Sequence, residues 1–238
     1  YTQSTYYSIF NHYMNEKNFF DFNFDDLKLF LNKDLKIEEK KVSMRSKQIW
    51  QSVYKKGSFE INNLTTFPLD LRDKLNNLIN LRRPKIEKTQ NSSDGTIKWL
   101  IKLFDGNEVE CVYIPEKTRA TLCISSQVGC TLNCKFCHTG TQLMVKNLTT
   151  HEIINQILVA KDELNDWGSQ KKITNIVYMG MGEPFYNYDN VKKSISILKE
   201  HNGLDYSPKK ITVSTAGISN EIVKAADEIG TYLALSLH

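Results

Sequence analysis

The sequence lacks any long apolar run and any strong excess of charge. No stretch approaches the roughly 20 consecutive apolar residues of a membrane-spanning helix, and the first residues lack the basic and then apolar pattern of a secretory signal. The 31 basic and 27 acidic residues leave a net charge of +4, which permits a polyanionic partner without requiring one. We therefore expect a protein that does not bind a membrane. We also expect it to be a monomer in the cytoplasm, with an organelle as the alternative compartment.

Cysteine is also scarce. The chain has five cysteines, an odd number that argues against a disulfide scaffold. Four of them (Cys123, Cys130, Cys134 and Cys137) lie close together in the sequence, which suits metal or redox chemistry in a reducing compartment. The sequence begins at Tyr1 instead of a methionine and stops in an apolar, strand-like run, so we expect an excerpt of a longer protein.

The hydrophobic pattern predicts an α/β fold with a small helical domain before it. Residues 1–23 have no clean period and are expected to form an arm or linker. Helical spacing between residues 24 and 92, as in Ile49, Trp50 and Val53, predicts the helical accessory domain. Residues 93–238 then form a β-hairpin followed by the core.

The core alternates short apolar strands with amphipathic helices. The expected strands cover residues 173–179, 211–214 and 232–237, and Thr149 with Glu152 forms a capping box at the start of a helix. This alternation predicts βα units and a parallel sheet, either doubly wound or part of a (β/α) barrel.

Cys130, Cys134 and Cys137 follow the spacing C-x3-C-x2-C on a loop after an expected strand. Three such thiolates can hold three corners of a [4Fe–4S] cluster and leave one iron without a protein ligand. The amino and carboxylate groups of S-adenosylmethionine (SAM) can chelate that iron, and an electron from the cluster then breaks a carbon–sulfur bond to give a deoxyadenosyl radical. The spacing therefore indicates a radical SAM enzyme.

Two other interpretations of these cysteines stay open. Cys134 to His138 also matches C-x-x-C-H, the signal for c-type haem attachment, but that use leaves Cys130 idle and is typical of exported proteins. Structural zinc is the stronger rival because Cys123 could supply a fourth thiolate, although the wide gap before Cys130 fits zinc ribbons poorly.

Residues 180–184, with the sequence GMGEP, end an expected strand. Two glycines let backbone approach a ligand, and Glu183 can accept a hydrogen bond from an ammonium group. An ordinary strand-ending turn would explain the same residues. In barrel enzymes, however, the chemistry lies at the C-terminal ends of strands, where the cysteine loop, Glu183, Ser214 and residues 236–238 all fall.

At this point the chain resembles a known family over residues 44–238. The segments that carry the resemblance are 47–50 (KQIW), 94–96 (DGT), 109–115 (VECVYIP), 125–130 (SSQVGC), 147–149 (NLT) and 180–184 (GMGEP). They resemble the radical SAM RNA methyltransferases that methylate carbon 2 of adenine in large-subunit ribosomal RNA and, in some members, transfer RNA. The resemblance implies a partial (β/α) barrel, incomplete at its C-terminus, and an electron donor such as flavodoxin or ferredoxin.

The resemblance also implies roles for particular residues. The cluster ligands would be Cys130, Cys134 and Cys137, and the cofactor contacts would be Gly182, Glu183, Ser214, Ser236, Leu237 and His238. Glu110 would be the proton acceptor. Cys123 would resolve a protein–RNA adduct by forming a disulfide, after transfer through a methyl-cysteine that lies beyond His238.

Without the resemblance these residues have plainer interpretations. Glu110 would be a solvated hairpin carboxylate, Cys123 a small buried hydrophobe and His238 a strand-end histidine. The chain departs from the family at Leu143 and Met144, where members usually carry glycine and phenylalanine, so the shape of the loop after the cluster is open.

The helical domain would contact the RNA by the same resemblance. The candidate phosphate partners are Lys40, Lys41, Arg45, Lys47, Lys55 and Lys56, which could equally form a solvated helix face. Two other functions remain as alternatives: a radical SAM enzyme with another target such as carbon 8 of adenine, and a non-catalytic RNA-binding protein stabilised by zinc.

Overall fold

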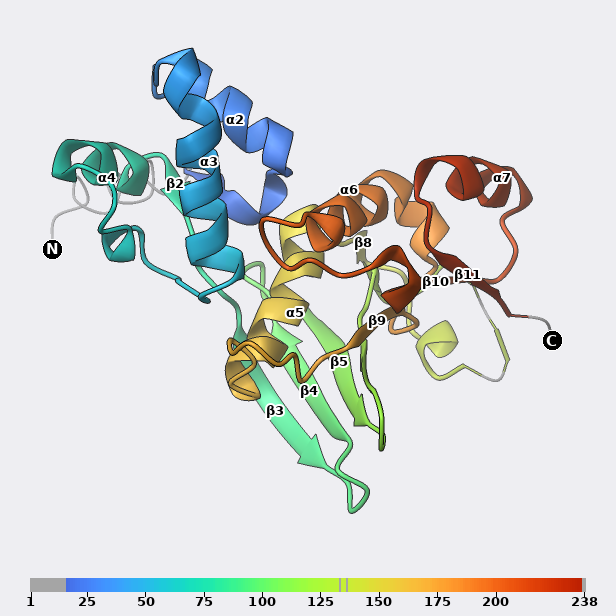
Figure 1. Ribbon diagram of the computed structural model, residues 1–238. Helices are drawn as coiled ribbons and strands as arrows, with labels where there is room; N and C mark the ends of the chain where they lie inside the picture. Colours follow the sequence, from blue (N-terminus) through green and yellow to red (C-terminus); the bar gives the residue numbers. More distant parts are fainter. Residues whose placement is uncertain (1–15, 133, 136, 237–238) are drawn as a thin grey trace, which may run out of the picture. The chain divides into compact units, whose positions relative to one another are not determined.

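The computed structural model describes residues 16–132, 134–135 and 137–236, which divide into two compact units (Figure 1). The first unit ends at Arg82 and the second begins at Arg83. This division falls earlier than the boundary expected after residue 92, because Lys85–Asn91 form a strand, β3, in the sheet of the second unit.

Helices make up most of the first unit. Its elements are β1 (Lys17–Asn18), a 3-10 turn (Phe19–Asp21), α2 (Phe24–Lys33), α3 (Glu39–Tyr54), a second 3-10 turn (Ile61–Asn63), α4 (Leu69–Asn76) and β2 (Ile79–Asn80). Phe19, Phe20 and Trp50 are fully buried in an aromatic core. Residues 16–23 are therefore part of this unit and not of an arm, because the rings of Phe19 and Phe20 fill its core. Residues 1–15 lie outside the described part of the chain.

A large sheet organises the second unit. Its strand order in the described residues is β11-β10-β9-β6-β5-β4-β3. The strands are β3, β4 (Ile97–Lys102), β5 (Glu108–Pro115), β6 (Ala120–Cys123), β9 (Asn175–Tyr178), β10 (Ile211–Thr215) and β11 (Tyr232–Leu235). Neighbours from β3 to β6 are antiparallel, and neighbours from β6 through β9 and β10 to β11 are parallel. The sheet thus changes from antiparallel to parallel at β6.

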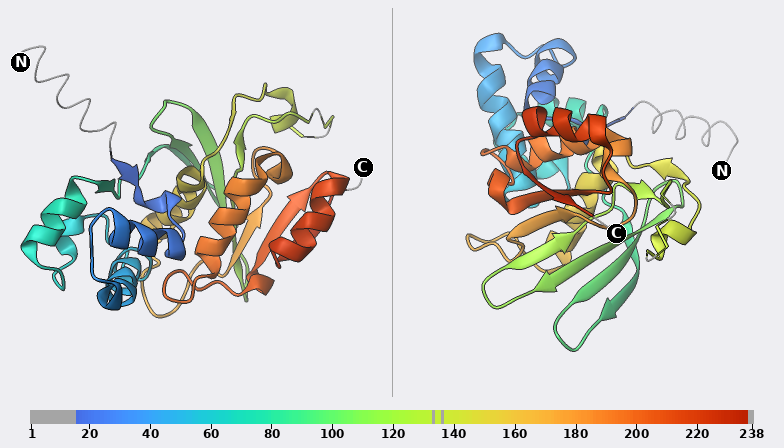
Figure 2. Two further views of the ribbon diagram at one scale, coloured as in Figure 1. Left: turned by 90° about the horizontal axis from the view of Figure 1, so that it is seen from above. Right: turned by 90° about the vertical axis from the view of Figure 1, so that its right-hand side faces the viewer.

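Three helices alternate with the parallel strands, as Figures 1 and 2 show. They are α5 (Thr150–Glu163), α6 (Tyr188–Lys199) and α7 (Ser219–Glu228), with 3-10 turns at Thr139–Thr141, Pro184–Asn187 and Pro208–Lys210. A separate antiparallel pair, β7 (Gln127–Val128) and β8 (Lys146–Asn147), brackets the cysteine loop. None of the described helices has the length and apolarity to cross a bilayer. The α/β class with a partial (β/α) barrel is confirmed.

The two faces of the sheet differ in burial. Leu122, Ile176 and Val213 are fully buried on one face. On that face the Tyr178 hydroxyl lies 2.7 Å from Ser194 Oγ of α6, so a helix covers it. The residues that alternate with these, including Cys123, Val177 and Ser214, are only partly buried. The second face is therefore the one that the fold leaves accessible for chemistry.

Candidate active site

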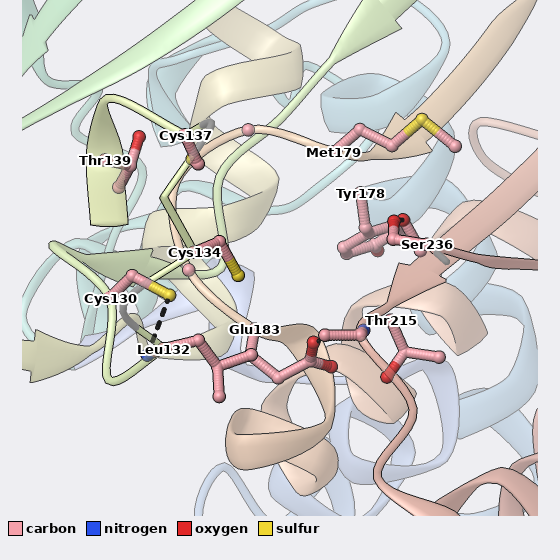
Figure 3. A pocket seen from close by; sticks show the side chains of 14 residues that line it. Cys130, Leu132, Cys134, Cys137, Thr139, Tyr178, Met179, Glu183, Thr215 and Ser236 are labelled. Carbon is pink, nitrogen blue, oxygen red and sulfur yellow. Dashed lines mark hydrogen bonds between the residues drawn. The ribbon is translucent and has the colours of Figure 1, made fainter. Parts of the chain in front are cut away.

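A cavity of about 260 Å³ lies where β9, β10 and β11 end, and we call it the cysteine cavity (Figure 3). The cysteine loop forms one wall and the strand ends form the other. The predicted residues in its lining are Cys130, Cys134, Cys137, Gly182, Glu183, Ser214 and Ser236. Leu237 and His238 lie outside the described residues. The fold thus gathers side chains that are far apart in the sequence.

The cysteine loop is shaped by its own backbone. Cys137 N–H donates to the Cys134 carbonyl at 3.0 Å, and Leu132 N–H reaches Cys130 Sγ at 3.4 Å. Gly129 has φ +75°, and a Cβ there would lie 2.1 Å from the Leu143 carbonyl oxygen. The Leu143 side chain is 90% exposed, so the loop packs on the backbone at this position and the departure from the family leaves that packing intact.

The three thiols of the loop are free and partly buried. Figure 3 shows the sulfurs of Cys130 and Cys134 pointing into the same space. Burial raises the pKa of the Cys130 thiol, the neighbouring Cys134, Cys137 and Glu183 add to the rise, and the Leu132 N–H opposes it. Such thiols must lose their protons before they bind a metal.

The arrangement of the thiols distinguishes between a zinc site and an iron–sulfur cluster. Zinc draws four ligands to roughly 2.3 Å from one ion, and no three His, Cys, Asp or Glu side chains in the described ranges converge around a single ion in this way. Cys123, the fourth thiol of a structural zinc site, does not line the cysteine cavity. A cubane instead takes one thiolate at each of three separate corners. Three thiols around one cavity therefore fit a [4Fe–4S] cluster better than tetrahedral zinc.

Glu183 is fixed at the opposite wall. The residue is only 3% exposed, and its carboxylate accepts hydrogen bonds from two backbone amides. Phe185 N–H lies 3.1 Å from Oε1 and Ala216 N–H lies 2.8 Å from Oε2, so the carboxylate joins the ends of β9 and β10. Each oxygen keeps a further lone pair for an ammonium donor from the cavity.

The two glycines before Glu183 line the cavity and also allow a close backbone contact that was not predicted. Residues 180–183 form what we call the glycine turn. A Cβ at Gly180 would lie 2.6 Å from Ser125 Oγ, and one at Gly182, whose φ is +95°, would lie 2.4 Å from Gln127 Cβ. The glycines therefore let the turn approach residues 125 and 127, in addition to lining the cavity.

Ser214 and Ser236 stand side by side at the ends of β10 and β11. Their hydroxyl oxygens are 3.3 Å apart, and Ser236 N–H donates to the Thr215 carbonyl at 2.9 Å. The parallel register pairs Ser214 with Ala234, which brings Ser236 to the same end of the sheet. Both hydroxyls are thus available to the cavity.

Glu110 lies outside the cysteine cavity. Its carboxylate pairs with Lys98 Nζ at 2.9 Å, and both side chains are about half exposed. It lines a second hollow of about 390 Å³, the glutamate hollow, together with His138 and Met181. Thr139 lines both spaces, so the two adjoin. The structure is compatible with either predicted role of Glu110.

Cys123 is the last residue of β6 and lines neither of these two spaces. It is partly buried, and burial raises the pKa of its thiol to about 11, although the Met179 N–H opposes the rise. Met179 itself lines the cysteine cavity. Cys123 therefore contacts a residue of the cavity lining without lining the cavity itself, and its thiol is mostly protonated.

Six residues of the lining were not predicted from the sequence: Leu132, Thr139, Tyr178, Met179, Thr215 and Ala216. Met179 and Thr215 follow from the rule that barrel chemistry lies at strand ends, because they end or follow β9 and β10. Thr139 carries no comparable signal, since it lies in a short 3-10 turn of the cysteine loop and not at a strand end.

The basic residues of the first unit divide into two groups. Lys40 and Lys41 both pair with Glu38, and Arg45 donates to the Thr66 carbonyl and stacks over Phe67. The other three candidates, Lys47, Lys55 and Lys56, are exposed. They remain the better candidates for phosphate contacts.

Comparison with known proteins identifies the superfamily of this chain. The model of the radical SAM superfamily matches residues 124–238, which contain the cysteine loop, the glycine turn and both serines. A crystal structure of a radical SAM methyltransferase from Sphaerobacter thermophilus superposes with a TM-score of 0.83 at 34% identity, covering 93% of this chain and 63% of that one. The chain belongs to the radical SAM superfamily.

Curated relatives narrow this assignment. The dual-specificity RNA methyltransferase RlmN of Nitrobacter winogradskyi is 49% identical over 207 residues, covering 82% of this chain and 52% of the relative. The RlmN proteins of Rhodospirillum rubrum and Rhizorhabdus wittichii are 50% and 45% identical over 82% and 90% of this chain. Within the superfamily, the chain belongs to the family of these RNA methyltransferases. It spans about half the length of the curated relatives it matches.

Proposed function

We propose that the protein is a radical SAM methyltransferase that methylates carbon 2 of an adenine in large-subunit ribosomal RNA through a methyl-cysteine, with transfer RNA as a second substrate. The observation that supports the proposal most is the cysteine cavity, in which Cys130, Cys134 and Cys137 face the buried carboxylate of Glu183. The names of the relatives supply the substrate class.

The residues of the cavity divide the work of holding a cofactor. Cys130, Cys134 and Cys137 would hold a [4Fe–4S] cluster, which supplies the electron that generates a radical from SAM when both are bound. Glu183 would accept from the ammonium group of SAM, oriented by the amides of Phe185 and Ala216. Ser214 and Ser236 would donate hydroxyl hydrogen bonds from the adjoining strand ends. Leu237 and His238 complete the proposed set.

Glu110 and Cys123 are proposed to act on the substrate side. Glu110 would accept a proton from the activated methyl group or the adduct. It lines the glutamate hollow, which adjoins the cysteine cavity. Cys123 would resolve the adduct through a disulfide. Carbon 2 of adenine is electron-poor and not nucleophilic, which is why radical chemistry and a thiol are needed there.

The remaining parts of the proposal concern partners. The exposed Lys47, Lys55 and Lys56 of the first unit would contact RNA phosphates. The target adenine must leave its stack to be reached, so loop or single-stranded RNA is expected. A flavodoxin or ferredoxin would supply electrons to a monomeric enzyme, and a reducing compartment such as the cytoplasm suits its five free cysteines.

Anaerobic reconstitution with iron and sulfide tests the cluster. We expect about four irons per chain and the broad charge-transfer absorption of a cubane. Cys134→Ala should abolish both. Cys111→Ala is the matched control, because Cys111 is a fully buried thiol that donates to the Gln156 carbonyl and does not line the cavity. Stoichiometric zinc binding with no iron retained would contradict the proposal and favour a zinc-stabilised RNA-binding protein.

Dithionite reduction of the reconstituted protein with SAM then tests the chemistry. Formation of 5′-deoxyadenosine supports the radical assignment. Mass spectrometry of RNA treated with the full-length protein, which includes the expected methyl-cysteine, identifies the methylated position, and methylation at carbon 8 would replace the carbon 2 assignment without affecting the cluster. Glu110→Gln, which is nearly isosteric, should abolish methylation while leaving 5′-deoxyadenosine formation intact.

A further inference from the structure

We propose that Ser125 and Gln127 are positioning residues that hold the glycine turn, and with it Glu183, at a fixed place relative to the cysteine loop. Ser125 also ties this assembly to the strand of Glu110. We call residues 124–127 the serine segment. The inference rests on the proposed function, in which Glu183 accepts from SAM, and it concerns how this chain's own residues place that carboxylate.

The serine segment binds the backbone of the glycine turn. Gly180 N–H donates to the Ile124 carbonyl at 3.0 Å. The carbonyl of Met181 accepts from both Ser126 N–H at 2.9 Å and Gln127 N–H at 3.1 Å. The two segments are therefore joined by main-chain hydrogen bonds beyond the last residue of β6 and β9.

Two side chains complete this contact, and both are fully buried. Ser125 Oγ accepts from Met181 N–H at 2.9 Å, and Gln127 Oε1 accepts from Glu183 N–H at 2.9 Å. Gln127 Nε2 donates to Asn147 Oδ1 at 2.7 Å, which fixes the orientation of the amide. The backbone amide of Glu183 is thus held by a side chain only three residues before Cys130 in the sequence.

Ser125 also links the turn to β5. Its hydroxyl donates to the carbonyl of Glu110 at 2.7 Å while accepting from Met181. One hydroxyl group therefore bridges the strand of the proposed proton acceptor and the turn of the proposed cofactor ligand. An alanine at this position would leave a buried N–H without its partner, and such groups are rare in native proteins.

A buried glutamine of α5 holds the serine segment from behind. Gln156 Oε1 accepts from Ser125 N–H at 2.8 Å and Nε2 donates to the Ser125 carbonyl at 2.9 Å. Asn187 Nδ2 donates to the Ser126 carbonyl at 2.8 Å. Backbone groups of the segment thus form hydrogen bonds both to the glycine turn and to buried side chains behind it, which leaves the segment little freedom to shift.

The consequence for the site is geometric. Groups that orient metal ligands through hydrogen bonds change metal affinity or activity by roughly 10- to 100-fold when they are removed, and we expect an effect of the same order for a residue that orients a ligand of SAM. Because neither Ser125 nor Gln127 is a proposed cluster ligand or lines the cysteine cavity, their loss should leave cluster assembly intact and weaken SAM binding. That separation distinguishes a positioning role from a general role in folding.

The variants are Ser125→Ala and Gln127→Met, and the matched control is Thr174→Val. Thr174 Oγ1 donates to the Ala120 carbonyl at 3.1 Å and accepts from Ala120 N–H at 2.9 Å, so it joins the same two strands, β6 and β9, at their opposite ends. Hydrogen exchange is measured on the cluster-free protein. Exchange in residues 180–183 should become about tenfold faster in each variant, as expected for the loss of one hydrogen bond, and remain unchanged in the control.

SAM affinity is then measured on the reconstituted proteins. We expect full iron content in all of them and an affinity that is roughly 10- to 100-fold weaker in Ser125→Ala and Gln127→Met. Unchanged exchange in residues 180–183, unchanged SAM affinity, or an equal loss of affinity in Thr174→Val would each overturn the inference. A wild-type protein that assembles no cluster would instead overturn the proposed function, and the exchange result would still decide whether these side chains hold the turn.

Discussion

Replacement of Gly182 by alanine should destabilise the second unit through two separable effects. The backbone of Gly182 has φ +95°, a conformation that residues with a side chain rarely adopt. The new Cβ would also lie 2.4 Å from Gln127 Cβ and 2.6 Å from its Cγ. Those atoms are near the root of a buried side chain with both ends of its amide hydrogen bonded, so they cannot simply swing away.

The expected magnitude follows from three contributions. A left-handed backbone costs a non-glycine residue roughly 1–2 kcal/mol, and overpacking in a buried site costs roughly 1–3 kcal/mol. Removing a glycine from the unfolded chain offsets roughly 0.4–1 kcal/mol. Gly182→Ala should therefore lower the free energy of unfolding by about 2–4 kcal/mol.

Gly106→Ala isolates the backbone effect. Gly106 has φ +89° in the turn between β4 and β5, and a Cβ there would meet no atom within 4 Å. The net loss should be about 1 kcal/mol or less. Urea unfolding of the cluster-free, reduced protein measures both variants. A Trp50→Phe background removes the tryptophan of the first unit, so fluorescence reports on Trp99 and Trp167. Equal losses in the two variants would refute the steric argument.

Two further predictions concern ionisable groups. The carboxylate of Asp166 is fully buried and lies 3.0 Å from Nζ of Lys161, whose side chain is only 6% exposed. Asp166→Asn should lower the free energy of unfolding in urea by about 3–5 kcal/mol, because it leaves the buried charge of Lys161 without its partner. A loss below about 1 kcal/mol would contradict this. Burial raises the pKa of the Cys123 thiol from 9.0 to about 11, so the folded protein keeps a proton that the unfolded chain loses. Stability should therefore be complete below pH 9 and fall as the pH rises towards 11. The fall should be smaller in Cys123→Ala, and identical slopes in the two proteins would show that Cys123 does not contribute.

Parts of the fold were predictable because one physical signal dominates them. Residues 173–179 and 211–214 are short apolar runs between amphipathic helices, and they contain β9 and all of β10 except its last residue, Thr215. β3 gave no such signal, because Lys85–Asn91 is a polar edge strand whose residues are largely exposed. Its strand conformation comes from pairing with β4, a tertiary contact that local sequence does not encode.

The site shows the same division. The cysteines and Glu183 could be found from spacing and from their position at strand ends. The function of Gly182 could not, because the atoms that demand a glycine belong to Gln127, which is distant in the sequence. Gln156 did carry a usable signal: it is an amide among the apolar residues of α5, and its full burial requires partners, which are the two backbone groups of Ser125.

The direction of the strands explains why the proposed proton acceptor is harder to recognise than the cofactor ligands. β6, β9, β10 and β11 run parallel, so their residues reach the site where each strand ends. β5 runs antiparallel to β6, and the pairing of Val112 with Cys123 places Glu110 level with the residues that follow β6. A residue of β5 must therefore lie near the start of its strand to reach the same edge of the sheet. The rule that functional residues lie at the C-terminal ends of strands does not identify such a residue. The hydrogen bond from Ser125 to the Glu110 carbonyl spans this junction and, beyond the pairing of β5 with β6, joins the antiparallel part of the site to the parallel part.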